Sequence, residues 1–133
     1  MAHSGSSSGC ILVVDDQPAN LRAVSALLTR HGYSVAIAGS GEEALQLAGE
    51  TTPDLLLLDM MMPGMDGFEL LARLKERPEL QRLPAVFLTA AQDRELLLRA
   101  FDAGAVDYVT KPFGREMLRQ ALQRASDRLA GAS

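Results

Sequence analysis

The sequence predicts an α/β domain in which a doubly wound, five-stranded parallel sheet is covered by helices on both faces. Short apolar segments alternate with segments whose apolar residues have helical spacing, and this alternation is typical of consecutive β/α units. The apolar runs within 10–15 and 54–59 are continuous, as in strands buried on both faces. A chain of 133 residues is long enough for one such domain.

Two strands and a helix are expected first. The segment CILVVD at 10–15 is a continuous apolar run that ends in acid, which favours a buried strand. Residues 17–31 carry apolar side chains at helical spacing, and Gly32 follows where glycine commonly ends a helix. A second strand is expected at 33–38, where β-branched residues recur.

The next helix is expected at 41–50. It would be opened by a capping box, in which Ser40 and Glu43 each accept a hydrogen bond from a backbone N–H group at the helix start. The most apolar stretch, DLLLLD at 54–59, is expected to be the central strand. Proline and glycine within 60–67 indicate a loop.

Asp66 and Glu69 form a similar pair before a helix expected at 67–76. After a loop bracketed by two prolines, 84–90 is expected to be the fourth strand and 93–103 the fourth helix. The last unit is a strand at 105–110 and a helix at 115–130. One apolar face of that helix is expected from Met117, Leu118, Ala121, Leu122, Ala125 and Leu129.

The composition excludes several classes of protein. A single cysteine rules out a disulfide framework and a cysteine-based zinc site, and two histidines leave no histidine-rich metal site. The chain is acidic, with a net charge of −4 and a pI of about 5.1, whereas domains that bind nucleic acids are typically basic. No apolar run approaches the roughly 20 residues that cross a membrane. We therefore expect a cytoplasmic domain without direct contacts to nucleic acid or membrane.

The domain is expected to fill most of the chain. The Ser/Gly-rich residues 1–9 are interpreted as a flexible leader or linker, 10–130 as the folded domain and 131–133 as a tail. No second domain is expected on this chain, which would be either a single-domain protein or an excised domain.

Polar residues stand where the expected strands end, and ligands bind at the carboxyl ends of strands in doubly wound sheets. These residues are Asp15, Asp16, Asp59, Thr89 and Lys111. Crowded carboxylates favour a cation between them, and ligand sets made of oxygen alone favour a hard ion, Mg²⁺ first.

Four segments resemble the receiver domain of two-component response regulators: ILVVDDQPANL, LLLLDMMMPGMDG, VFLTA and GAVDYVTKPF. They occur in the order and strand context of that family, over about residues 10–130. The resemblance implies a flavodoxin-like fold with strand order 2-1-3-4-5. It also implies a phosphorylation-activated signalling switch.

The resemblance assigns roles to the acidic residues. Asp59 would be the phosphoacceptor, a carboxylate nucleophile that forms an acyl phosphate. Asp16 and Asp59 would bind Mg²⁺ (or Mn²⁺) directly, and Asp15 would bind it through water. The backbone carbonyl of Met61 would be a further ligand.

The resemblance also assigns roles beyond the carboxylates. Lys111 would pair with one phosphoryl oxygen, and the hydroxyl of Thr89 would donate to another. Tyr108 would turn inward when Thr89 moves toward the phosphate, and the Lys111–Pro112 peptide bond would be cis. The residues alone leave simpler interpretations open, with Thr89 as an ordinary strand hydroxyl and Tyr108 as a side chain that fills space.

The implied partners follow from the implied chemistry. A sensor histidine kinase or a histidine phosphotransfer protein would supply the phosphoryl group from a phosphohistidine. Phosphorylation would alter the surface formed by 93–103, 105–110 and 115–130, which would also be a route to dimers. The chain would catalyse only its own phosphorylation and slow dephosphorylation. The cognate kinase and the downstream effector or fused domain stay unidentified.

Three other interpretations compete with this one. Residues 39–44 fit a G-x-G-x-x-A dinucleotide fingerprint, but they follow the second strand, and the capping box explains them. A phosphatase of the haloacid dehalogenase type would need an acid two residues after Asp59, where Met61 stands. A degenerate receiver, used only for interaction, would not need the complete acidic pair together with Asp59, Thr89 and Lys111.

Overall fold

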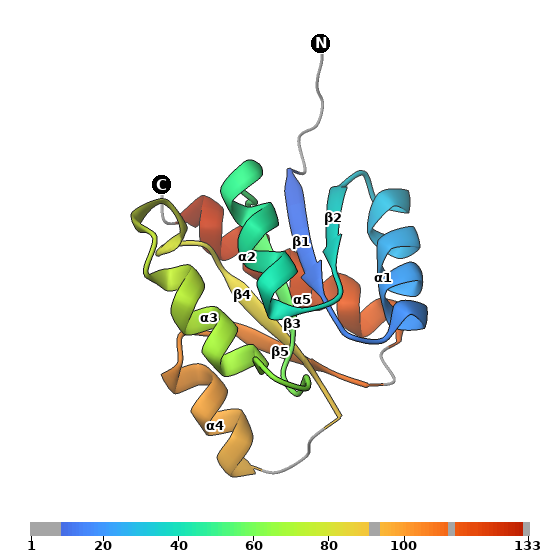
Figure 1. Cartoon of the computed structure of the whole chain (residues 1–133). Coiled ribbons are helices and arrows are strands. Elements are labelled where there is room, and N and C mark those ends of the chain that lie inside the picture. The colour runs from blue at the N-terminus through green and yellow to red at the C-terminus, as the bar shows by residue number, and fades with distance from the viewer. Residues whose placement is uncertain (1–8, 91–93, 112–113, 132–133) are drawn as a thin grey trace.

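The computed structural model describes residues 9–90, 94–111 and 114–131, except for the side chains of 126 and 128–131. The strands are β1 (Cys10–Val14), β2 (Ser34–Ala38), β3 (Leu55–Asp59), β4 (Ala85–Thr89) and β5 (Asp107–Thr110). The helices are α1 (Pro18–Arg30), α2 (Gly41–Glu50), α3 (Gly67–Lys75), α4 (Arg94–Asp102) and α5 (Arg115–Gly131), with a 3-10 helix, η2 (Pro78–Leu80), after α3. Strands and helices alternate along the chain, as expected (Figure 1).

The five strands form one parallel sheet in the order β2-β1-β3-β4-β5, which confirms the predicted fold class and strand order. Neighbouring strands end nearly level with one another. Val14 pairs with Leu58 at the end of β1, and Thr89 pairs with Thr110 at the ends of β4 and β5. The residues that follow these ends therefore meet along one edge of the sheet.

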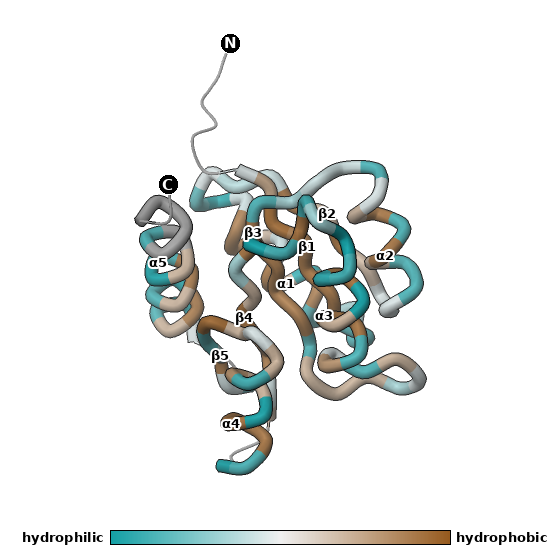
Figure 2. The backbone as a smooth tube through the Cα atoms, turned by 90° about the vertical axis from the view of Figure 1, so that its left-hand side faces the viewer, coloured by the Kyte–Doolittle hydropathy of each residue, from teal (hydrophilic) through white to brown (hydrophobic). Residues whose placement is uncertain are grey.

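Two hydrophobic layers enclose the sheet. Alternate strand residues, such as Leu12 and Val13, point to opposite faces and join different clusters. One layer packs the sheet against α1 and α5, and the other packs it against α2, α3 and α4. Figure 2 shows hydrophobic strands between helices whose hydropathy varies along their length. Because both of their faces are covered, the three inner strands β1, β3 and β4 consist mainly of buried apolar residues.

The expected helix caps are confirmed. The N–H of Glu43 donates to Ser40 Oγ at 3.2 Å, and the N–H of Gly39 donates to Glu43 Oε1 at 2.7 Å. The N–H of Glu69 donates to Asp66 Oδ1 at 2.9 Å at the start of α3. The segment that resembles a dinucleotide fingerprint is therefore a capped helix start.

Two local features differ from the sequence-based expectation. Strand β5 begins at Asp107 rather than at 105, because the N–H of Ala105 still donates to Ala100 and closes α4. The expected loop between α3 and β4 contains η2, which Leu80 anchors with a fully buried side chain. Lys75 supports the turn by donating to the carbonyls of Gln81 and Leu83 at 2.7 and 2.9 Å.

The apolar face of α5 is narrower than predicted. Met117 was expected on that face, but its side chain is 46% exposed, whereas Leu118 beside it is fully buried. Consecutive helix residues differ by about 100° in direction, so only one of these two can face the sheet. The hydroxyl of Thr110 donates to the Met117 sulfur at 3.5 Å, over the end of β5. Among the described helices, none has the length and apolarity to span a membrane.

Candidate functional site

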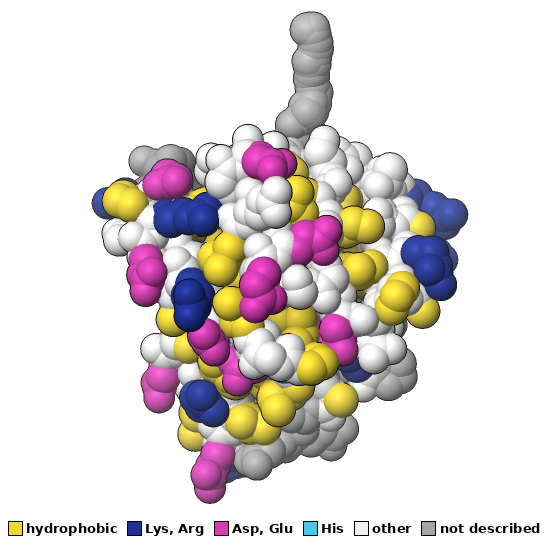
Figure 3. Space-filling view, in the orientation of Figure 1, with side chains coloured by type: hydrophobic (Ala, Val, Ile, Leu, Met, Phe, Trp, Pro, Cys, Tyr) yellow, Lys and Arg dark blue, Asp and Glu magenta, His cyan; other side chains and the backbone are white. Residues whose placement is uncertain are grey.

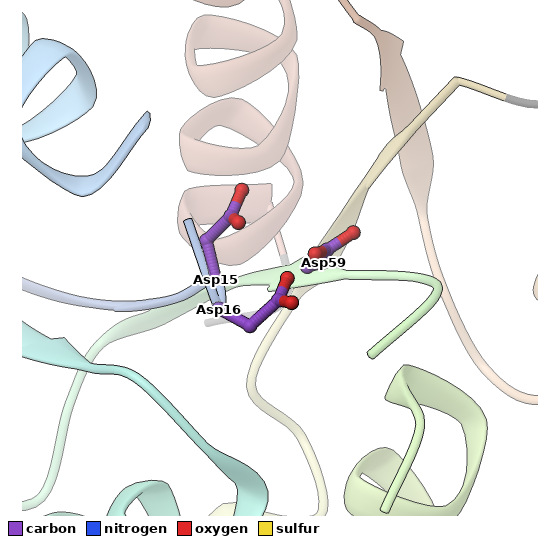
Figure 4. A group of neighbouring side chains, drawn as sticks. All are labelled: Asp15, Asp16 and Asp59. Carbon is purple, nitrogen blue, oxygen red and sulfur yellow. The ribbon is translucent and has the colours of Figure 1, made fainter. Parts of the chain in front are cut away.

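Three carboxylates meet at the carboxyl edge of the sheet. Asp15 and Asp16 follow β1, and Asp59 is the last residue of β3 (Figure 4). One carboxylate oxygen from each lies within 4.8 Å of the others. Asp15 and Asp59 are buried, whereas Asp16 is partly exposed. The fold thus brings together the acidic residues that sequence analysis selected.

Lys111, which directly follows β5, joins this cluster. Its Nζ lies 3.0 Å from Asp59 Oδ1 and 3.1 Å from Asp15 Oδ2, and its side chain is largely buried. The backbone N–H of Lys111 donates to the carbonyl of Thr89 at 2.7 Å, directly after β5. Thr89 itself is buried at the end of β4. The lysine and the threonine are therefore fixed side by side through their backbones.

The charges of the site shift one another's pKa values. The pKa of Asp59 is raised to about 6, mainly by burial and also by the charge of Asp15, although the hydrogen bond from Lys111 lowers it. Burial lowers the pKa of Lys111, but its hydrogen bonds to Asp59 and Asp15 outweigh that effect and raise the pKa overall. At neutral pH Asp59 is thus mostly a carboxylate that faces an ammonium group.

The donor set of the site fits a divalent cation. Three carboxylates face one ammonium group, so negative charge is left over in a largely buried place. All the side-chain ligands available are oxygens, which hard ions such as Mg²⁺ prefer. Asp15, Asp16 and Asp59 could hold such an ion.

The loop after Asp59 packs closely against the site. The N–H of Met61 donates to Asp59 Oδ1 at 3.3 Å, while the Met61 side chain is 61% exposed. Met60, Met62 and Met65 in this loop are buried. Gly67 begins α3 so close to β3 that a Cβ on it would lie 2.4 Å from the Asp59 carbonyl oxygen.

Asn20 is a polar residue of the site that the pattern of strand ends does not identify. Its side-chain amide donates to Asp15 Oδ2 at 3.2 Å, and the N–H of Gln17 donates to Asp15 Oδ1 at 2.9 Å. The signal available in the sequence was position: Asn20 lies in the first turn of a helix that begins just after the acidic pair.

Two further expectations concern Tyr108 and Pro112. Tyr108 is half-buried on β5, with its ring edge-on to Phe101 at a centroid distance of 6.2 Å. Its inward turn stays a prediction. Pro112 lies outside the described residues, so the expected cis peptide bond also stays a prediction.

Comparison with known proteins identifies the same family. The sequence pattern of the response regulator receiver domain matches residues 11–123. The response regulator PleD of Caulobacter vibrioides is 44% identical over 111 residues, which are 84% of this chain and 24% of PleD. The transcriptional regulatory protein KdpE of Mycobacterium tuberculosis is 40% identical over 123 residues, or 92% of this chain and 53% of KdpE.

Solved structures agree. Chemotaxis protein CheY4 of Vibrio cholerae superposes with a TM-score of 0.84 at 33% identity, over 87% of this chain and 97% of CheY4. The chain spans about a quarter to a half of the length of the two curated relatives named above. A family match over most of the sequence, the strand order and the acidic edge of the sheet lead to one assignment: the chain belongs to the response regulator receiver domain family.

Proposed function

We propose that Asp59 accepts a phosphoryl group from a phosphohistidine of a sensor histidine kinase or of a histidine phosphotransfer protein. The reaction requires Mg²⁺ or Mn²⁺, and it alters the surface of α4, β5 and α5. Membership of the receiver family supports a phosphorylation-activated switch. The observation that carries the residue assignment is the 3.0 Å contact between Lys111 Nζ and the Asp59 carboxylate beside two further aspartates.

Asp59 is suited to act as the nucleophile. One of its oxygens would form a bond to phosphorus while the bond from phosphorus to the histidine nitrogen breaks, and the neutral imidazole leaves after taking up a proton. A pKa of about 6 keeps most Asp59 side chains ionised at neutral pH, as this attack requires. Lys111 would turn from the carboxylates to a phosphoryl oxygen, and Thr89 would donate its hydroxyl to another.

Asp15, Asp16 and Asp59 would hold the divalent ion, together with the backbone carbonyl of Met61. When bound, such an ion would neutralise negative charge on the phosphoryl oxygens. The excess of carboxylates over ammonium groups in the site supports this requirement. Without the ion, three carboxylates would repel an incoming phosphoryl group.

The responding surface is expected on α4, β5 and α5. Three large apolar side chains of this surface are exposed: Leu98 (58%) and Phe101 (44%) on α4, and Met117 (46%) on α5. They could contact a partner protein or a second copy of the chain. Figure 3 shows acidic, basic and hydrophobic side chains intermixed on the face that α2, α3 and α4 cover. Tyr108 on β5 contacts Phe101, which supports a link between the sheet and α4.

The test is phosphorylation by a small phosphodonor such as acetyl phosphate. Mass spectrometry of the intact chain should record one added phosphoryl group with Mg²⁺, and none with EDTA. Asp59→Asn should abolish the addition. Asp54→Asn, at the residue directly before the first residue of β3, is the matched control and should leave it unchanged. Undiminished labelling of Asp59→Asn, or labelling that EDTA does not reduce, would contradict the proposal.

A further inference from the structure

We propose that Asn20 is a positioning residue of the phosphoryl site, which holds the Asp15 carboxylate in its orientation when Lys111 turns away to the phosphoryl group. The proposal rests on the function proposed above. In this arrangement Asp15 has two side-chain donors: Asn20, which stays in place, and Lys111, which moves away.

Asp15 is a fully buried carboxylate, and such a group is stable only when hydrogen-bond donors surround it. Three donors reach it. The N–H of Gln17 donates to Oδ1 at 2.9 Å, while Asn20 Nδ2 at 3.2 Å and Lys111 Nζ at 3.1 Å both reach Oδ2. Asn20 thus shares one oxygen with the lysine.

The position of Asn20 follows from the start of α1. Pro18 is the first residue of the helix, where its fixed φ suits the geometry, and Asn20 stands two residues later. Helical side chains lean toward the amino terminus, so the Asn20 amide reaches back over the turn that carries Asp15. The helix start therefore fixes the donor relative to β1.

The two donors on Oδ2 differ in what else they contact. Lys111 Nζ also lies 3.0 Å from Asp59 Oδ1, and in the proposed reaction it moves to a phosphoryl oxygen. Within the described part of the chain, Asp15 is the hydrogen-bond partner recorded for the Asn20 side chain. When the lysine leaves, Asn20 still satisfies Oδ2, and the Gln17 N–H still satisfies Oδ1.

Without Asn20, Asp15 would depend on Lys111 as its side-chain donor. The carboxylate would then rotate more freely, or it would hold the lysine back from the phosphoryl group. The freer rotation weakens the site for a divalent ion even before phosphorylation, because Asp15 is one of the residues that would hold the ion. Removing a group that orients a metal ligand typically costs about 10-fold to 100-fold in metal affinity.

The experiment measures Mn²⁺ affinity from the electron paramagnetic resonance signal of free Mn²⁺. Asn20→Ala and the nearly isosteric Asn20→Leu should each raise the dissociation constant about 10-fold. Gln17→Ala is the matched control, because it removes a neighbouring exposed amide side chain and keeps the backbone N–H that donates to Asp15. It should stay within about 2-fold of the wild type.

A double-variant cycle tests whether Asn20 acts through Asp15. In an Asp15→Asn background, Asn20→Ala should change the Mn²⁺ dissociation constant by less than about 2-fold. Urea unfolding in EDTA verifies that each variant is folded. An undiminished effect in the Asp15→Asn background, or equal losses for Asn20→Ala and Gln17→Ala, would overturn the inference. A wild-type chain that binds no Mn²⁺ would instead contradict the proposed function.

Discussion

Ionisation of the Asp59 carboxylate at neutral pH lowers the stability of the folded state. Its side chain is almost fully buried, and burial outweighs the favourable contact with Lys111, so its pKa lies near 6 rather than near 3.8. A buried carboxylate with a raised pKa does not stabilise the fold at neutral pH, and such groups are typical of reactive sites. The same balance of burial and pairing leads to two predictions about individual residues.

Asp59→Asn should stabilise the metal-free domain at neutral pH. The folded pKa of Asp59 lies above the unfolded one, so the folded state binds the proton more tightly, and stability falls as pH rises from about 4 to about 6. Above that window the variant should be more stable than the wild type by about 1 to 3 kcal/mol. Urea unfolding in EDTA at pH 4 and pH 7.5 measures the difference, and an equal gap at both pH values would be inconsistent with this explanation.

Lys111→Met should act in the opposite direction. It leaves the buried carboxylates of Asp15 and Asp59 without their shared ammonium, which should cost about 2 kcal/mol at pH 8 and less at pH 5, where Asp59 is protonated. The control is Lys75→Met, since among the described residues Lys75 donates to two carbonyls and to no carboxylate. Its cost should be the same at both pH values, and a similar pH dependence for both variants would count against the explanation.

Individual elements were predictable from the sequence to within about two residues, because strand and helix patterns are local. Continuous apolar runs identified β1 and β3, recurring β-branched residues identified β2, and the capping pairs located the starts of α2 and α3. The sequence-based expectation was wrong where side-chain packing determines the local structure. Met117 lies next to Leu118 in the sequence but on the exposed side of α5, and η2 depends on the burial of Leu80.

Gly67 is required where α3 meets β3. A Cβ there would lie 2.4 Å from the Asp59 carbonyl oxygen and 2.9 Å from the Phe87 ring, so Gly67→Ala must displace the start of α3. We expect a loss of about 1 to 3 kcal/mol in unfolding free energy and slower phosphorylation of Asp59. Gly114→Ala has open space around the added carbon and should be close to neutral. A neutral Gly67→Ala in urea unfolding would refute the close approach.

Helix α4 depends on few contacts. Ala100 is its one fully buried side chain, and the Arg99 guanidinium lies 4.2 Å from the ring centre of Phe68 on α3. Arg99→Met should remove about 0.5 to 1 kcal/mol of local stability and speed hydrogen exchange of the α4 amides. Arg94→Met, on the same helix and without a ring contact in the described part of the chain, should leave exchange unchanged. Equal acceleration in both variants would mean that helix charge, not the ring contact, is responsible.

At the level of the whole molecule, topology assembles the candidate site. A parallel sheet in the order 2-1-3-4-5 brings the ends of β1, β3, β4 and β5 to one edge, so the grouping of Asp15, Asp59 and Lys111 could be predicted from strand ends alone. Asn20 could not, because its contact depends on how α1 leaves the sheet. The pairing of Lys111 with both carboxylates likewise depends on side-chain geometry, which no sequence motif specifies.

The most direct test locates the phosphoryl group in the chain. Borohydride reduces an aspartyl phosphate to homoserine, which peptide mass spectrometry then assigns to a residue. After treatment of the protein with acetyl phosphate and Mg²⁺, we predict homoserine at position 59 and unmodified aspartate at 15 and 16. Homoserine at 15 or 16, or none in a chain that has gained a phosphoryl group, would contradict the assignment of Asp59 as the phosphoacceptor.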